Sequence, residues 1–270
     1  MANNKKQWIL ITGASTGIGY ACAAYLAKNG FGVYAGARNA KDLENLGQIQ
    51  NVVPVKLDVT NLSDIDSAFE LIQKAGTGIF GLVNNAGIPM GAPALDITDE
   101  ELQTIFNINI LGVHRVTRKF CPLLLDSHGR ILMMSSYNGK VAIPFMAAYV
   151  MSKFGLEGYS DCLRRELQMY DIKVIIIEPG PIKTPIWDKG DVLVENYKKK
   201  TPLIKELGEI AIDAFTESIE TSRKNGLPAE TVAKTVYEAL TVLKPKPRYP
   251  VMKNPFMFKM VYKLLSDEKI

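Results

Sequence analysis

Short apolar runs and longer segments of helical period alternate along the chain, and this alternation predicts the architecture. Apolar runs predict strands at 8–12, 32–37, 52–57, 80–84, 130–135, 174–178 and 248–251. Segments of helical spacing predict helices at 17–29, 42–49, 63–75, 99–125, 147–170 and 228–243. The strands are apolar on both faces, as in a parallel sheet covered by helices on two sides. With right-handed crossovers, we expect an α/β fold with a doubly wound parallel sheet, in a single domain spanning residues 1–270.

Two helix starts carry sequence signals of their own. Thr98 precedes Asp99, Glu100 and Glu101, and this pattern predicts a helix N-cap followed by an acidic first turn. Pro228 opens the helix predicted at 228–243 and suits the first helical position, where a missing N–H does no harm.

Two segments depart from the alternation. The stretch 185–227 mixes apolar and charged residues with several prolines and glycines, and it is either a long surface excursion or a functional segment. Within 255–265, apolar residues recur on one helical stripe. We favour packing of this stripe on the domain itself or on a second subunit. The alternative is a helix that lies on a membrane surface with its lysines at the headgroups.

Composition and charge narrow the classes of function. The chain has 47% hydrophobic and 22% charged residues, as globular proteins do, and its net charge of +4 is too small to indicate nucleic-acid binding. The cysteines Cys22, Cys121 and Cys162 are far apart and only two histidines occur, so we expect no metal site. Residues 1–7 lack the apolar core of a secretory signal, and no run approaches the roughly 20 apolar residues of a membrane helix. We therefore expect a cytoplasmic protein with reduced thiols.

Tyr149 and Lys153 form the most informative pair of polar residues. If the segment that holds them is helical, residues four positions apart share one face. An ammonium group beside a phenol favours the phenolate and lowers a pKa that is otherwise about 10. Such a tyrosine can exchange a proton with an alcohol or a ketone near neutral pH. Ser136 lies a short loop upstream and can donate a hydrogen bond to the same oxygen.

A glycine-rich turn joins the first predicted strand to the first predicted helix. It reads Thr12-Gly13-Ala14-Ser15-Thr16-Gly17-Ile18-Gly19. The glycines let a pyrophosphate approach the backbone, and the helix N-terminus offers free N–H groups and a partial positive charge. Strand, glycine turn and helix in this order predict a dinucleotide-binding site, although the glycine spacing differs from the commoner Gly-x-Gly-x-x-Gly.

Together these segments resemble the short-chain dehydrogenase/reductase family. The matching elements are the glycine turn, Asn84-Asn85-Ala86-Gly87, Asn109 in Asn107-Ile108-Asn109-Ile110-Leu111-Gly112, Ser136, Tyr149-x-x-x-Lys153 and Pro179-Gly180, which occur in the family's order over residues 8–185. The resemblance implies a Rossmann-type sheet, a nicotinamide coenzyme and interconversion of a carbonyl and an alcohol. The segment 185–227 then corresponds to the substrate-binding loop and helices.

The resemblance also implies roles for the catalytic residues. Tyr149 is the general acid in reduction and the base in oxidation, and Lys153 tunes it while holding the nicotinamide ribose hydroxyls. Ser136 stabilises charge on the substrate oxygen. Asn109 anchors a water molecule near the lysine and completes a proton relay. The neighbouring Ser135 is the alternative to Ser136. The sequence separation from Tyr149 favours Ser136.

The coenzyme choice depends on the end of the second predicted strand. Relatives that prefer NAD carry an acidic residue there for the ribose 2′-hydroxyl, whereas this chain has Ala37 and then Arg38. A cation suits a 2′-phosphate, so we expect NADP(H) in preference to NAD(H). The other residues expected at the coenzyme are Gly13, Ser15, Thr16, Gly17, Ile18, Gly19, Asp58, Val59, Asn85, Ala86, Gly87, Pro179, Gly180, Ile182 and Thr184.

The sequence predicts a small-to-medium, fairly apolar substrate but does not identify it. Apolar residues around the expected pocket support this polarity: Ile143, Pro144, Phe145, Met146, Ile186 and Trp187. The chain is similar both to the retinol and hydroxysteroid branch and to general ketone reductases. Two alternatives remain: an epimerase or dehydratase on the same scaffold, and a catalytically silent NADP-binding regulator. The resemblance further implies a homodimer or homotetramer built on the helices at 99–125 and 147–170.

Overall fold

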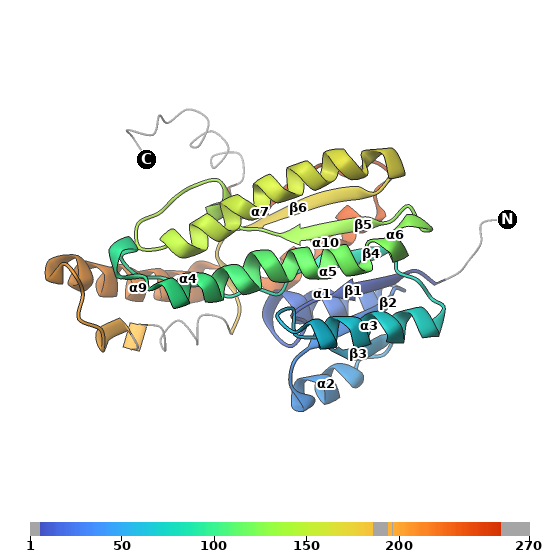
Figure 1. Cartoon of the computed structure of the whole chain (residues 1–270), viewed down its shortest axis with the longest axis horizontal. Helices are drawn as coiled ribbons and strands as arrows, with labels where there is room; N and C mark the ends of the chain where they lie inside the picture. Colours follow the sequence, from blue (N-terminus) through green and yellow to red (C-terminus); the bar gives the residue numbers. More distant parts are fainter. Residues whose placement is uncertain (1–5, 186–193, 196, 255–270) are drawn as a thin grey trace.

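Seven parallel strands form one sheet in the order β3-β2-β1-β4-β5-β6-β9. The computed structural model describes residues 6–185, 194–195 and 197–254 (Figure 1). The strands are β1 (Trp8–Ile11), β2 (Gly32–Ala37), β3 (Val52–Lys56), β4 (Gly81–Asn84), β5 (Arg130–Met134), β6 (Lys173–Pro179) and β9 (Arg248–Val251). The order reverses between β1 and β4, and such a switch point is where doubly wound sheets bind ligands. The doubly wound, Rossmann-type sheet predicted from the sequence is confirmed.

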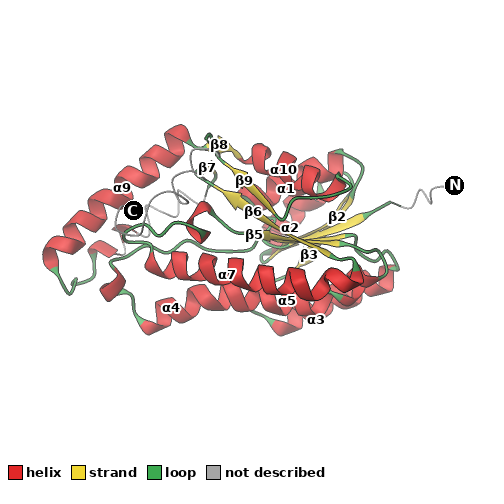
Figure 2. Cartoon of the chain, turned by 90° about the horizontal axis from the view of Figure 1, so that it is seen from above, coloured by secondary structure: helices red, strands yellow, loops and turns green. Residues whose placement is uncertain are grey.

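Two layers of helices cover the sheet, as Figure 2 shows. The helices that flank it are α1 (Gly17–Lys28), α2 (Ala40–Gly47), α3 (Leu62–Ala75), α5 (Val113–Phe120), α7 (Ala147–Glu166) and α10 (Ala229–Thr241). One core lies between the sheet and α1 and α10, with Leu26 and Val236 among its fully buried members. The other core lies under α3, α5 and α7, with Phe120 and Leu156. Buried strands with apolar side chains on both faces require such a three-layer arrangement, because each face must be shielded from water.

The remaining elements lie outside the seven-stranded sheet and its flanking helices. They are η1 (Ala94–Asp96), α4 (Asp99–Phe106), η2 (Asn107–Gly112), α6 (Pro122–Leu125), η3 (Tyr137–Gly139), η4 (Leu167–Tyr170), β7 (Ile182–Lys183), α9 (Lys205–Asn225) and β8 (Leu227–Pro228). The chain leaves the seven-stranded sheet after β6 and returns to it at β9, and in between β7 and β8 pair in parallel as a separate two-stranded sheet. The excursion between them carries α9, which extends beyond one end of the sheet (Figure 2).

The helix predicted at 99–125 is not one regular helix. It is α4, α5 and α6 with the π-helical segment η2 between α4 and α5. A wider π turn shifts the side chains that follow it, and such segments often occur at functional sites. Thr98 is the predicted N-cap, and it forms a full capping box with Glu101. Pro228 is the N-cap of α10 rather than its first residue, because α10 begins at Ala229.

No helix in the described part of the chain is long and apolar enough to cross a membrane. The amphipathic stripe predicted within 255–265 lies outside the described residues.

Thr12 joins the ends of β1 and β4, which lie on the two sides of the switch point. Its hydroxyl oxygen accepts hydrogen bonds from the backbone N–H groups of Asn85 and Ala86, both at 3.0 Å. The side-chain amide of Asn85 returns two bonds of 2.9 Å, to the carbonyl oxygens of Thr12 and Gly13. Thr12 is 1% exposed, so water cannot replace these bonds. One hydroxyl and one amide thus hold the glycine turn against the loop after β4.

We predict that Thr12→Val lowers the free energy of unfolding by about 2–6 kcal/mol, because the backbone N–H groups of Asn85 and Ala86 lose their acceptor at about 1–3 kcal/mol each. Thr104→Val is the matched control, since that hydroxyl only donates to the Glu100 carbonyl on an exposed helix and its loss should change stability by about 0.5 kcal/mol or less. Urea unfolding of both variants measures the difference. Equal stabilities of the two variants would contradict the role given to Thr12.

Candidate active site

A cleft of about 900 Å³ opens at the carboxyl ends of the strands and continues along α9. With one exception, every residue predicted to bind the coenzyme or to catalyse lines this cleft. The lining members of that set are Gly13, Ser15, Thr16, Gly17, Ile18, Gly19, Arg38, Asp58, Val59, Asn85, Ala86, Gly87, Ser136, Tyr149, Lys153, Pro179, Gly180, Ile182 and Thr184. Asn109 does not line it. The fold thus brings together residues from seven separate stretches of sequence at one edge of the sheet.

Each of the three glycines of the turn excludes a side chain for a different steric reason. Gly13 has φ +64°, and a Cβ there would lie 2.8 Å from the Ala86 Cα. Gly17 has φ +58°, a backbone conformation that side chains disfavour. A Cβ on Gly19 would lie 2.2 Å from the Gly13 carbonyl oxygen. Any larger residue at these positions must therefore move the turn.

The start of α1 fits a phosphate group. Thr16 is the N-cap and is extended, and within the described chain its side chain makes no capping hydrogen bond. The first N–H groups of α1 have no partner inside the helix, and they start at Gly17, in the wall of the cleft. Uncapped N–H groups together with the helix dipole attract an anion. The bare glycine turn and this open helix end match the pyrophosphate of a nicotinamide dinucleotide, which the residues present can therefore hold.

Arg38 and Asp58 mark the end of the cleft away from α9. Arg38 follows β2 directly and its side chain is exposed, so the guanidinium is available to a ligand. Burial alone raises the pKa of Asp58, yet hydrogen bonds from Thr60 and the charges of Arg38 and Lys56 bring this pKa below its ordinary value. Asp58 is thus a carboxylate whose hydroxyl and amide partners at Thr60 hold it in place, at 2.7 and 2.8 Å.

Ser136, Tyr149 and Lys153 meet at the middle of the cleft. Tyr149 and Lys153 are one turn apart on α7, and the Lys153 Nζ lies 5.6 Å from the centre of the tyrosine ring. Nζ donates a 2.8 Å hydrogen bond to the Met134 carbonyl at the end of β5. Ser136 follows β5 and its hydroxyl acts on the phenol by hydrogen bonding, whereas Ser135 Oγ is buried and finds no partner among the described residues. This geometry favours Ser136 over Ser135 as the residue beside the phenol.

The predicted lowering of the Tyr149 pKa is not what the structure shows. Burial raises the pKa of Tyr149 to about 12, against a smaller lowering by the Ser136 hydrogen bond. Burial also lowers the pKa of Lys153 to about 8, while the charge of Glu157 opposes that change. The reason is that desolvation penalises the charged form of both groups. The sequence spacing identifies the pair but does not show that both side chains are buried. A phenol with a raised pKa is neutral, and the neutral form can donate a proton.

Asn109 lies under the cleft instead of in it. It is 1% exposed, and its amide donates to the Ile88 carbonyl at 3.0 Å and to Ser152 Oγ at 3.1 Å. Its side-chain oxygen accepts from the Ile88 N–H at 2.9 Å. Ser152 in turn donates to the Tyr149 carbonyl at 2.8 Å. The side chain of Asn109 thus ties the loop after β4 to the helix that carries Tyr149, which is a structural tie that the sequence did not predict.

The end of the cleft near α9 is lined by two aromatic rings together with polar side chains of that helix. Phe145 and Phe215 pack edge to face with ring centres 6.1 Å apart. Phe145 has φ +65°, a strained conformation for a bulky residue, and its carbonyl accepts from the Ala92 N–H at 2.8 Å. A Cβ on Gly91 would lie 2.4 Å from the Phe215 ring, so only glycine leaves room for it. Ile143, Pro144, Phe145 and Met146 line the cleft as predicted, and Ile186 and Trp187 lie outside the described residues.

The sequence did not reveal what α9 contributes. Phe215, Ser218, Ile219 and Ser222 all line the cleft from this helix. Their spacing of three, four and seven residues is that of a single helical face, which is the signal that could have found them. Tyr137 and Asn138 after β5 also line the cleft and were not predicted. No group of metal-binding side chains occurs among the residues that the structure describes.

Comparison with known proteins agrees with this geometry. The family model described as short chain dehydrogenase matches residues 7–191. The NADPH-dependent 3-dehydrocapnine reductase of Ornithobacterium rhinotracheale is 34% identical over 98% of this chain and 94% of its own. Retinol dehydrogenase 16 of Homo sapiens is 34% identical over 92% of this chain and 81% of its own. The structure of 3-ketoacyl-(acyl-carrier-protein) reductase from Brucella melitensis complexed with NADH is 26% identical, covers 91% of this chain and 96% of that one, and has a TM-score of 0.73.

The matched region contains the whole glycine turn and the Ser136, Tyr149 and Lys153 group, and the relatives cover nearly the full chain. Family membership carries with it oxidoreductase chemistry on a small molecule with a nicotinamide coenzyme, in which a carbonyl and an alcohol interconvert. This chain belongs to the short chain dehydrogenase family.

Proposed function

We propose that this protein is an NADP(H)-dependent oxidoreductase that interconverts a carbonyl and an alcohol on a small-to-medium, fairly apolar substrate, with Tyr149 as general acid and base. The observation that carries the proposal is the meeting of Ser136, Tyr149 and Lys153 in one cleft with the open N-terminus of α1. A proton donor and a coenzyme site in the same cavity are what carbonyl reduction needs.

Each of the three residues has a separate task in this proposal. The coenzyme supplies the hydride when it is bound. Tyr149, neutral because its pKa is raised to about 12, donates its proton to the substrate oxygen during reduction. Ser136 donates a hydrogen bond to the same oxygen and stabilises charge as it develops. Lys153 presents an ammonium group to the ribose and to the phenol, and its positive charge stabilises the phenolate that proton donation leaves on Tyr149.

Arg38 supports NADP(H) as the coenzyme. Its guanidinium is exposed at the end of β2, next to the cleft, and can pair with a 2′-phosphate through two parallel hydrogen bonds. The relative from Ornithobacterium rhinotracheale is named as NADPH-dependent. The relative from Brucella melitensis was solved with NADH, so the family alone does not decide the choice.

The lining of the cleft near α9 supports an apolar substrate. Phe145, Phe215 and Ile219 present rings and methyl groups there, whereas Ser218 and Ser222 add hydroxyls on the same helix. Such a mixture suits a molecule with one carbonyl and an apolar body. We propose that the excursion between β7 and β8, within the predicted segment 185–227, is the substrate-binding part of the domain.

We also propose a homo-oligomer that uses the outer faces of α5 and α7. Met151 and Phe154 on α7 and Leu111 on η2 are exposed large apolar side chains, at 49%, 44% and 46%. Gly155 and Gly158 are exposed next to them and permit close approach of a second helix. We further propose a cytoplasmic location, and packing of the stripe within 255–265 on protein in preference to a membrane surface. The three cysteines are free thiols.

We predict that Tyr149→Phe lowers kcat/KM for carbonyl reduction about 100- to 10,000-fold, because the proton donor is lost. NADPH consumption with a panel of ketones, aldehydes, steroids and retinoids measures it, and fluorescence titration checks that NADPH still binds. Tyr159→Phe is the control, since its hydroxyl pairs with His114 of α5 and Tyr159 does not line the cleft. Near-normal turnover by Tyr149→Phe, or a wild type that binds NADPH and consumes none, contradicts the proposal.

We predict that Arg38→Ala raises the KM for NADPH about 10- to 100-fold and leaves that for NADH nearly unchanged, because a charge-assisted bond to a phosphate is worth about 1.5–3 kcal/mol. Lys41→Ala is the control, an exposed cation at the start of α2 that does not line the cleft. Steady-state kinetics with both coenzymes measure the effect. A wild type with equal Michaelis constants for NADPH and NADH would overturn the choice of coenzyme.

We predict that Phe154→Glu converts the protein from an oligomer to monomers, because the new charge must be buried in the contact between subunits. Sedimentation velocity reports the mass directly. Leu71→Glu on α3 is the control, because Leu71 is 42% exposed and lies on another helix. If the wild type sediments as a monomer, α7 is not an interface.

A further inference from the structure

Glu157 is a buried carboxylate that the mechanism above does not use. It lies one turn beyond Lys153 and two turns beyond Tyr149 on α7, so the three share one face of the helix. Glu157 is 4% exposed. A carboxylate without access to water is costly unless charges around it compensate for the lost hydration. The cations that contact Glu157 therefore determine how strongly its negative charge acts on the neighbouring Lys153.

The cations near Glu157 act on only one of its oxygens. Lys140 Nζ and Arg248 Nε each lie 3.1 Å from Oε2. The other oxygen, Oε1, is buried and has no hydrogen-bond partner among the described residues. Both Oε1 and Ser135 Oγ lie close to the bare Cα of Gly139, where a Cβ would be 3.2 Å and 2.7 Å from them. Lys153 Nζ bonds the Met134 carbonyl, one residue before Ser135, so the ammonium belongs to the same region.

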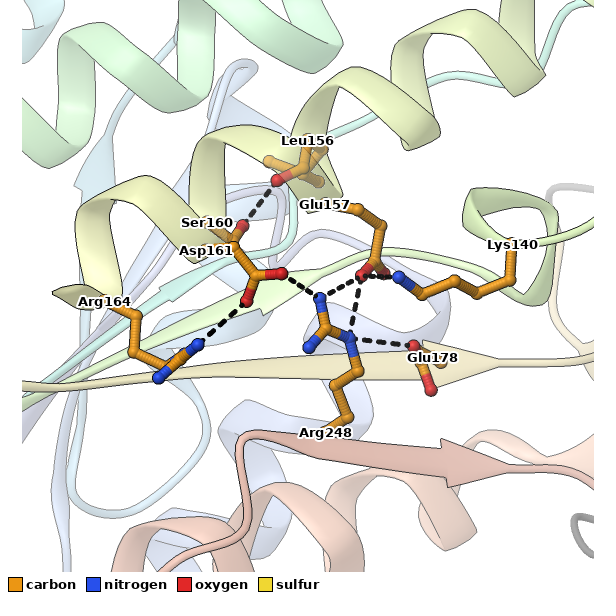
Figure 3. A network of polar contacts seen from close by, with 8 residues as sticks. All are labelled: Lys140, Leu156, Glu157, Ser160, Asp161, Arg164, Glu178 and Arg248. Atoms are coloured by element: carbon orange, nitrogen blue, oxygen red, sulfur yellow. Dashed lines mark hydrogen bonds and ion pairs between the residues drawn. The ribbon is translucent and has the colours of Figure 1, made fainter. Parts of the chain in front are cut away.

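Arg248 links this carboxylate to the edge of the sheet. Figure 3 shows its guanidinium surrounded by Glu157, Asp161 and Glu178, with distances of 2.7 Å to Asp161 Oδ2 and 3.5 Å to Glu178 Oε1. Arg164 contacts Asp161 at 3.4 Å. The cluster therefore sets three carboxylates against three cations, and Lys153 stands next to it as a further positive group. Arg248 shares its charge among three acids and cannot neutralise Glu157 alone.

The titratable and charged groups around Lys153 and Glu157 come from several elements. Tyr149 and Asp161 lie on α7, Lys140 follows η3, Glu178 lies on β6 and Arg248 on β9, while Tyr137 on η3 acts on Tyr149. Burial among these elements lowers the pKa of Lys153 to about 8, and Glu157 acts in the opposite direction. Without the Glu157 charge, this pKa would fall further.

We propose that Glu157 is a positioning residue that keeps Lys153 in its ammonium form beneath the coenzyme site. The consequence for turnover rests on the function proposed above, because it needs Lys153 to act as a cation. The effect on Lys153 itself does not rest on it. Strand β9 takes part as well, because Arg248 at its start holds the Glu157 carboxylate in place.

The test follows the proton on Lys153 directly. Lysine side chains labelled with ¹³C and ¹⁵N are titrated by NMR in the nucleotide-free protein, and Lys153→Met assigns the signal. In Glu157→Gln we expect the Lys153 midpoint about 1 pH unit lower than in the wild type, as for loss of one nearby opposite charge. Glu157→Asp keeps the charge and should restore most of the shift. An unchanged midpoint in Glu157→Gln overturns the proposal.

Asp161→Asn is the matched control. It removes another carboxylate of the same Arg248 cluster but lies one turn farther from Lys153, so the midpoint should move by less than a third of the Glu157→Gln shift. A shift as large as that of Glu157→Gln means that general disturbance of the cluster is responsible, and it overturns the specific role of Glu157. Thermal unfolding of both variants shows whether their structural effects are comparable.

Lys140→Met tests the same idea if Glu157→Gln does not fold. Its side chain is 25% exposed, so the loss should be tolerated, and removal of one compensating cation strengthens the negative field at Lys153. We expect the Lys153 midpoint to rise, opposite to the change in Glu157→Gln, and an unchanged or lower midpoint overturns the proposal.

In the rate assay, the alkaline fall of kcat/KM for carbonyl reduction should move with the NMR midpoint. A midpoint that moves while the rate profile stays constant supports the role of Glu157 and contradicts the function proposed for Lys153.

Discussion

Lys153 carries an ammonium group to a place that is 7% exposed, and the structure around the cleft depends on how this charge is tolerated. A lone buried ammonium loses far more hydration than one hydrogen bond returns. The Met134 carbonyl at 2.8 Å supplies that one bond, and Glu157 supplies a charge of opposite sign on the next turn. Both partners depend on long-range features of the fold. Met134 is the last residue of β5, and Glu157 is itself held by Arg248 of β9.

The same edge of the sheet must also leave space for a dinucleotide. Thr12 and Asn85 solve this problem with hydrogen bonds that run between the ends of β1 and β4, so the glycine turn needs no bulky side chains to hold it. Gly19 packs its backbone against the Gly13 carbonyl for the same reason. At this edge of the sheet, hydrogen bonds between polar backbone and side-chain atoms replace the apolar packing found deeper in the sheet. This applies both to the open end of α1 and to the buried lysine.

Much of this arrangement could be predicted from the sequence, because it depends on local patterns. Buried strands such as β6 are apolar throughout, and parallel strands that alternate with helices leave few topologies open. The glycine turn and the pair Tyr149 and Lys153 are spacing motifs that survive without knowledge of the fold. The π-helical turn at Asn107–Gly112 could not be predicted, because the apolar period continues through it. The raised pKa of Tyr149 was missed for a different reason: burial is a property of the whole fold, and charge spacing along a helix does not report it.

The partly buried ion cluster, in which only Glu157 and Glu178 are fully buried, contributes an orientation more than it contributes stability. Replacement of buried ion pairs by apolar residues is often neutral or stabilising, because desolvation consumes the attraction between the charges. Arg248 with its three carboxylates therefore adds little to stability for the burial that it requires. What it does provide is a set orientation for Glu157, since a carboxylate held at Oε2 by two cations cannot turn away from the helix face that it shares with Lys153. A cluster with this geometry makes sense where the position of a charge matters more than its energy, and the end of a catalytic helix is such a place.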